Sequence, residues 1–132
     1  MKPQGECVAG ADVTVWDVAG ALRRLDGDEE LLHEVVGIFL EDIPGHLATL
    51  RRAINEGDLE AIERTAHSLK GEMGYLGISD LSLKAGELEH LGREREPGNV
   101  AQLLAVFETR LAAVVDAMRK MNLKLGKQSV AE

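Results

Sequence analysis

A chain of 132 residues with 45% hydrophobic residues has the length and the apolar content for one domain with one core. Its 15 basic and 23 acidic residues give a net charge of -8, which excludes nucleic acid as the expected partner, since phosphate backbones bind clustered Lys and Arg. Cys7 is the only cysteine, which excludes an intramolecular disulfide and favours a reducing, cytoplasmic location. No apolar run has signal-peptide or membrane-spanning length, so we expect no membrane contact.

A tail over residues 1–13 and a short first helix are the first expected elements. Thr14 followed by Asp17 resembles an N-cap with an acidic residue three positions later. The apolar residues of this segment keep helical spacing, at Trp16, Ala19, Leu22 and Leu25. We therefore expect a short helix that starts at Thr14.

A long second helix is expected after Gly27, with Asp28 as its N-cap. Its apolar residues keep spacings of three and four, at Leu32, Val35, Val36, Phe39, Ile43, Leu47, Leu50 and Ile54. Pro44 removes a backbone hydrogen bond and crowds the preceding turn, so we expect a kink near Asp42 rather than a full break.

The third helix has the clearest amphipathic pattern in the chain. Gly57 as a C-cap followed by Asp58 as an N-cap predicts a tight turn between antiparallel helices. Gly77 is the expected end of the helix. Its apolar stripe consists of Leu59, Ile62, Ala66, Leu69, Met73 and Leu76.

Two further helices complete the expected fold. Ser79 or Asp80 is the expected N-cap of the fourth helix, and residues 92–99, with Pro97 and Gly98, form the next turn. The last helix ends before a tail over residues 124–132. Its apolar residues are Val100, Leu103, Leu104, Phe107, Leu111, Val114, Val115 and Met118.

The pattern as a whole predicts an all-α protein. We expect an antiparallel up-down-up-down four-helix bundle over residues 14–123, with the short additional N-terminal helix packed against one end. Met73, Met118 and Met121 lie at helical spacing on apolar faces and are expected in the core or at its flank. Because no exposed apolar stripe is left over, a monomer is expected.

His67 stands out because it does not lie on the apolar stripe of its helix. At 100° per residue, it points roughly 130° away from the centre of that stripe. Its face also carries Glu63, Lys70, Gly71 and Gly74. We therefore expect an exposed imidazole, with a cation beside it.

The two glycines on this face need a reason, because each costs about 1 kcal/mol relative to alanine inside a helix. Gly71 and Gly74 would leave the imidazole open to another protein, and Lys70 could pair with a phosphoryl group as a mobile charge. Two other interpretations stay open. The glycines could instead allow close helix packing, and an exposed histidine could have no role.

The run His67-Ser68-Leu69-Lys70-Gly71, followed by Gly77, resembles the signature of histidine phosphotransfer (HPt) domains, the intermediates of multistep His-Asp phosphorelays. The resemblance extends to residues 27–32 and 39–44, which are similar to the family's second helix, and to the turn at residues 57–58. It covers roughly residues 13–121.

The resemblance implies a role for three residues in phosphoryl transfer. His67 corresponds to the phospho-accepting histidine, which attacks the acyl phosphate of a receiver-domain aspartate, usually through Nε2. Lys70 corresponds to the lysine that neutralises phosphoryl charge. Glu89 aligns with a carboxylate or amide that hydrogen-bonds the other ring nitrogen in some members. For Glu89, a solvated surface position is the open alternative.

The resemblance also implies a docking face for a receiver. Gly71 corresponds to the glycine that leaves room for the receiver, and Gly74 and Gly77 match glycines of several members. Tyr75 departs from a usually small or polar residue and is expected to border the contact, as is Arg64, whose alternative is a solvated charge without a role. Glu72 also departs from the family's small residue, and both departures bear on partner selectivity.

The expected function is that of a phosphorelay intermediate that takes a phosphoryl group from one receiver and passes it to another. Its expected partners are receiver domains of response regulators and a hybrid or sensor histidine kinase. We expect no cofactor on this chain and Mg²⁺ on the receiver. No phosphate-binding loop or kinase motif is present, so no enzyme activity of its own is expected. His33, His46 and His90 form no close ligand pair, so no metal site is expected.

Other functions stay open at this point. The same histidine could belong to the substrate domain of a chemotaxis-type kinase, or the bundle could be an adaptor that binds a receiver without being phosphorylated. A hydrolase or metalloprotein is disfavoured, because one histidine does not supply a nucleophile, a base and an acid.

Overall fold

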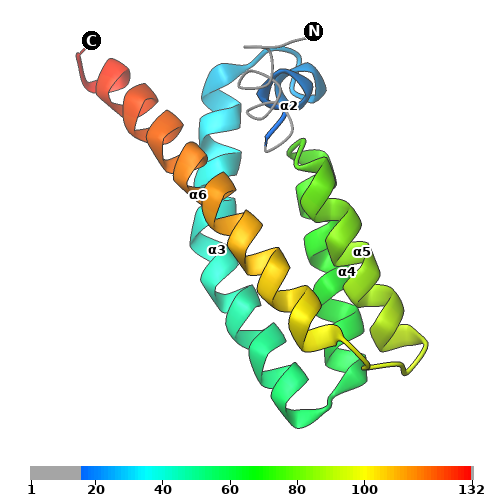
Figure 1. The fold of residues 1–132 in the computed structure, drawn as a ribbon. Helices are drawn as coiled ribbons and strands as arrows, with labels where there is room; N and C mark the ends of the chain where they lie inside the picture. The colour runs from blue at the N-terminus through cyan, green and yellow to red at the C-terminus, as the bar shows by residue number, and fades with distance from the viewer. Residues whose placement is uncertain (1–15, 132) are drawn as a thin grey trace, which may run out of the picture.

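The computed structural model describes residues 16–131, with the backbone alone for residues 122–131. These residues form five helices and no strand (Figure 1). The helices are α2 (Val18–Arg24), α3 (Glu29–Glu56), α4 (Leu59–Tyr75), α5 (Ser79–Arg93) and α6 (Val100–Ala131).

Helices α3 to α6 run alternately up and down and form the four-helix bundle that the sequence predicts (Figure 1). The short helix α2 lies at the end of the bundle where α3 begins and α4 meets α5. The described residues include no helix with the length and apolar content needed to cross a membrane.

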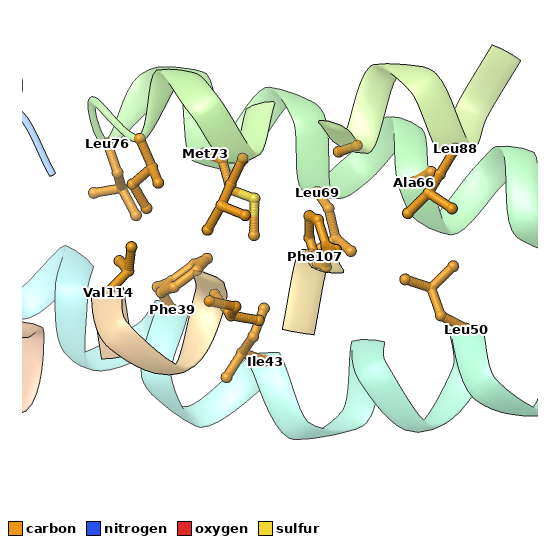
Figure 2. Close-up of a cluster of buried hydrophobic side chains, with 14 of the residues drawn as sticks. Phe39, Ile43, Leu50, Ala66, Leu69, Met73, Leu76, Leu88, Phe107 and Val114 are labelled. Atoms are coloured by element: carbon orange, nitrogen blue, oxygen red, sulfur yellow. The ribbon is translucent and has the colours of Figure 1, made fainter. Parts of the chain in front are cut away.

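One continuous core lies between the four long helices. Side chains of α3 face those of α4 across the bundle, and Phe107 of α6 lies between them (Figure 2). Trp16 and Phe39 are buried as expected, and Met73 and Met118 are fully buried. The apolar stripes of the sequence therefore identify the buried face of each long helix. The core residues labelled in Figure 2 are Phe39, Ile43, Leu50, Ala66, Leu69, Met73, Leu76, Leu88, Phe107 and Val114.

Aspartate caps begin three of the helices. The side chains of Asp28 and Asp58 accept hydrogen bonds from backbone N–H groups in the first turns of α3 and α4, as the sequence predicts. Asp17 caps α2 in the same way, so this helix begins at Val18 rather than at Thr14. Thr14 itself lies outside the described residues.

Two other helix boundaries differ from the expectation. The N-cap of α5 is Ile78, which is buried and offers no side-chain hydrogen bond, so neither Ser79 nor Asp80 is the cap. Here burial of an apolar residue takes precedence over capping. The backbone of α6 is helical through Ala131, where the sequence predicts a tail from residue 124.

Pro44 lies inside α3, which continues from Glu29 to Glu56 without a break. The flanking residues Phe39, Ile43 and Leu50 are all buried. Packing of this apolar stripe offsets the hydrogen bond that the proline removes.

The start of the described chain is tied to the turn between α4 and α5. The indole Nε1 of Trp16 donates to the carbonyl of Leu76 at 2.8 Å, and the amide of Asp17 donates to the carbonyl of Gly77 at 2.9 Å. Arg24 donates to the carbonyl of Tyr75 at 3.3 Å. These bonds satisfy carbonyl groups that the end of α4 leaves without helical partners.

Gly77→Ala should destabilise the fold more than other glycine replacements. Gly77 has a φ of +83°, and a Cβ there would lie 2.5 Å from the carbonyl oxygen of Asp17. Left-handed backbone and steric overlap therefore act together, and we expect a loss of about 2 kcal/mol or more in unfolding free energy. Denaturant unfolding measures it.

Gly57→Ala is the matched control, because Gly57 has a φ of +72° but open space around its Cβ position. It should lose only about 1 kcal/mol, the cost of the backbone conformation. Equal losses in the two variants would contradict the close approach of Asp17 to Gly77.

Candidate phosphotransfer site

His67 projects from the middle of α4 into solvent. Its neighbours Ala66 and Leu69 are fully buried, whereas the side chain of His67 is 68% exposed. The helix therefore places the imidazole outside the core, as the periodicity predicts.

Glu89 of α5 lies directly behind this imidazole. His67 Nδ1 is 2.8 Å from Glu89 Oε2, and Lys70 Nζ is 2.7 Å from Glu89 Oε1. The Glu89 side chain is only 5% exposed. This burial excludes the solvated surface position that the sequence leaves open for Glu89.

The cations around Glu89 decide its charge. Hydrogen bonding to Lys70 lowers the pKa of Glu89, burial opposes this effect, and the hydrogen bond with His67 lowers the pKa further. The net pKa lies below the ordinary value, so the carboxylate is ionised and only accepts hydrogen bonds. His67 must then donate through Nδ1–H, which leaves the lone pair of the neutral ring on Nε2.

Glu89→Gln should remove part of the acid sensitivity of the fold. Because the folded-state pKa of Glu89 is lowered, its ionised form contributes stability above the unfolded pKa of about 4.3. That stability is lost as the pH falls through the lower folded-state pKa. We expect the unfolding free energy of the variant to fall less steeply below about pH 4.3, measured by denaturant titration. Equal dependence of the unfolding free energy on pH in the variant and the wild type would contradict this expectation. The control is Glu87→Gln, which replaces an exposed glutamate on α5.

Arg93, at the end of α5, is a member of the site that the sequence analysis missed. Its Nη2 is 2.6 Å from Glu89 Oε2, and its Nε is 3.3 Å from Glu63 Oε2 on α4. The signal was present, since Glu89 and Arg93 are four residues apart on one helix. Glu89 thus has three cationic or donor partners, namely His67, Lys70 and Arg93.

The three glycines of the motif have different surroundings. Gly71 is exposed with nothing near its Cβ position, which fits the expected clearing beside His67. Gly74 is half-buried, and a Cβ there would lie 3.4 Å from Ser82 Oγ, so it also serves helix packing. Gly77 is buried in the turn after α4, so its expected place on the docking face is wrong.

Close packing of α4 against α5 brings the site residues together. A Cβ on Gly92 would lie 2.8 Å from the carbonyl oxygen of Leu59 and 2.9 Å from the amide nitrogen of Glu63. Ser82 Oγ donates to the carbonyl of Lys70 at 2.9 Å. The small residues of α5 therefore let α5 pack close enough to α4 for Glu89 to contact His67.

An apolar surface lies beyond His67, where α3 meets α4. Leu31, Ile38 and Tyr75 are exposed. A hollow of about 120 Å³ lies beside Ile38 and Tyr75, and Val35 and Glu72 also line it. We call Leu31, Ile38 and Tyr75 the α3–α4 patch. Tyr75 follows His67 by eight residues, about 12 Å along the helix.

Two other residues singled out in the sequence lie on the surface of α4. Arg64 is exposed and pairs with Glu60, with Nη1 3.3 Å from Oε2. Glu72 Oε1 lies 3.9 Å from His46 Nδ1 on α3. Glu72 thus faces α3 beside the hollow, not the imidazole of His67.

Comparison with known proteins assigns the family. The family model described as Hpt domain matches residues 34–120. The structure is similar to histidine-containing phosphotransfer protein B from Pseudomonas aeruginosa PAO1, with a TM-score of 0.77, 25% identity, and coverage of 83% of this chain and 95% of that one.

A second solved structure shares the fold. It is the HPT domain of the Hpt sensor hybrid histidine kinase from Shewanella, with a TM-score of 0.77, 16% identity, and coverage of 85% of this chain and 97% of that one. No curated protein matches the sequence. The chain therefore belongs to the Hpt domain family, whose members carry phosphoryl groups in phosphorelays and have no kinase activity of their own.

Proposed function

We propose that His67 accepts a phosphoryl group from the aspartyl phosphate of one receiver domain and passes it to the aspartate of another. The observation that carries the proposal is an exposed imidazole whose Nδ1 is bound to a buried, ionised Glu89. This contact keeps the proton on Nδ1 and leaves Nε2 as the nucleophile.

The proposed transfer of the phosphoryl group needs no further reactant. The Nε2 lone pair of His67 attacks phosphorus, the bond between phosphorus and the aspartyl oxygen breaks, and the aspartate leaves as a carboxylate. Nδ1 keeps its proton, and Glu89 stabilises the positive charge that develops on the ring. Transfer to the next receiver is the reverse reaction.

Charge on the moving phosphoryl group needs neutralisation from both proteins. Lys70 would supply an ammonium from this chain, and the receiver would supply Mg²⁺. Among the described residues no group of three His, Cys, Asp or Glu side chains is placed to hold a metal ion. The place of the Mg²⁺ on the partner is part of the proposal.

The α3–α4 patch is the surface on which we place the receiver, together with Gly71 and Arg64. An exposed apolar cluster is typical of a protein contact, and Tyr75 of this cluster lies on α4, the helix that carries His67. Gly71 would let the receiver backbone approach His67. We further propose a monomer that acts in the cytoplasm, which is consistent with the single cysteine and is tested by size-exclusion chromatography and by cell fractionation.

Ile38→Asp should weaken binding of a receiver by roughly tenfold or more, because it places an unpaired charge in the middle of the apolar contact. Isothermal titration calorimetry with the receiver measures this. Leu83→Asp on α5 is the matched control, since Leu83 is 71% exposed and Ile38 59% exposed, and it should bind normally. Equal weakening in both variants, or none in either, would place the receiver elsewhere.

The proposed function is tested by incubating the chain with a receiver that carries radiolabelled aspartyl phosphate. We expect label to move to the chain and to be acid-labile and alkali-stable, as a phosphohistidine is. A receiver that binds but transfers no label would favour the adaptor function. A chain that takes label only from an ATP-dependent kinase domain would favour the kinase-substrate function.

A further inference from the structure

The two carboxylate oxygens of Glu89 have different partners. Oε1 is 2.7 Å from Lys70 Nζ. Oε2 is 2.8 Å from His67 Nδ1 and 2.6 Å from Arg93 Nη2. The oxygen that orients the imidazole is therefore held by Arg93, while Lys70 holds the other oxygen.

Lys70 has two uses that compete. In the unphosphorylated protein its ammonium pairs with Glu89, and in the proposed reaction it pairs with the phosphoryl group. A carboxylate that is only 5% exposed is strongly destabilised when it loses its cation. If Lys70 were its only cation, Glu89 would hold the ammonium back from the phosphoryl group.

Arg93 is placed to keep its contact with Glu89 when Lys70 moves from Glu89 to the phosphoryl group. Its guanidinium contacts Glu89 on α5 and Glu63 on α4, with an Nε to Oε2 distance of 3.3 Å to Glu63. Glu63 lies one turn before His67. A guanidinium stays charged and can bind two carboxylates through a rigid set of donors.

We propose that Arg93 is a positioning residue of this site: it fixes Glu89 Oε2 against His67 and balances the charge of Glu89, so that Lys70 can move to the phosphoryl group. The inference rests on the proposed function of His67. Arg93 is needed because Glu89 is charged. Transfer should therefore no longer depend on Arg93 when residue 89 is a neutral amide.

A double-mutant cycle tests this dependence. Arg93→Ala should slow transfer to His67 roughly tenfold, the size typical of losing a group that orients a reactive residue. In a Glu89→Gln background the same change should have less than about a twofold effect. The rate is measured with a phosphorylated receiver and with phosphoramidate, a small donor that needs no docking surface.

Arg110→Ala is the matched control. Arg110 is 52% exposed and pairs with Asp80 at 2.7 Å, whereas Arg93 is 50% exposed. Arg110→Ala should accept the phosphoryl group at the wild-type rate. Arg93→Lys should keep most of the wild-type transfer rate, because a lysine restores the positive charge beside Glu89 Oε2. If Arg93→Ala does not fold, Arg93→Gln carries the same expectation. Equal slowing in both backgrounds, or none in either, would overturn the proposal.

Nitrogen NMR of the unphosphorylated protein gives a second, independent measurement. In the wild type and in Arg110→Ala, the His67 ring should carry its proton on Nδ1, whereas in Arg93→Ala the proton should be shared more evenly between the two nitrogens. An unchanged tautomer in Arg93→Ala would overturn the positioning role. This measurement needs no donor, so it distinguishes failure of this inference from failure of the proposed function, in which the wild type itself would take no label.

Discussion

A His67→Gln variant should bind a receiver normally and take no phosphoryl label from it. Glutamine replaces the imidazole with a polar amide of similar size. The amide has no nitrogen lone pair that can form a stable bond to phosphorus. The side chain of His67 is 68% exposed, so the replacement should leave the core intact. Label on the chain after incubation with a phosphorylated receiver measures the effect, which should be complete loss.

His90→Gln is the control for this variant. His90 is an exposed histidine on α5, one residue after Glu89, and its loss should leave the label unchanged. Acid-labile label that persisted in His67→Gln would mean that another histidine, or another residue type, is the acceptor. That result would end the assignment of His67.

The exposed face of α4 could be predicted from the sequence because its cause is local. A stripe with strict three- and four-residue spacing fixes which side of the helix is buried, and His67 lies outside it. The caps at Asp28 and Asp58 could be predicted for the same reason, since the capping side chain and the amide that it satisfies are only three residues apart.

The partners of Glu89 could be predicted only in part, because they depend on how α4 and α5 are aligned. Helix periodicity places Glu89 at a flank, but its distance from His67 is set by the packing of Gly92 against Leu59 and Glu63. Nothing in the local pattern of α5 encodes that approach. The resemblance to the family supplied the pairing with His67, and the contact of Arg93 with both carboxylates became visible only in the structure.

The wrong expectations have a common physical cause. The start of α5 was predicted from local turn chemistry and the docking-face position of Gly77 from the resemblance to the family, whereas both are decided by tertiary packing at the end of the bundle. Ile78 is buried there, and the amide of Asp17 binds the carbonyl of Gly77. Local preferences of a few tenths of a kcal/mol to about 1 kcal/mol yield to burial of a whole apolar side chain, worth about 2 kcal/mol.

Lys70→Ala should slow phosphoryl transfer to His67 by roughly tenfold or more and leave the fold intact. The ammonium is the only charge that the proposal assigns from this chain to the phosphoryl group, and removing one donor that stabilises developing charge typically costs a factor of about 100 to 1,000 in rate. Single-turnover transfer from a phosphorylated receiver measures it. Lys70→Arg should lose less, since it keeps the charge but changes its shape.

The stability of the Lys70→Ala variant is the decisive second measurement. Glu89 keeps its contacts with Arg93 and His67, and the Lys70 side chain is itself partly exposed, so we expect a loss of only about 1 kcal/mol in unfolding free energy. Lys120→Ala, which removes an exposed lysine paired with Asp116 on α6, should change neither rate nor stability. A Lys70→Ala variant that unfolded would show that Lys70 is needed to keep Glu89 buried and that Arg93 cannot balance the carboxylate alone. A folded variant that transfers slowly would instead place the function of Lys70 on the phosphoryl group.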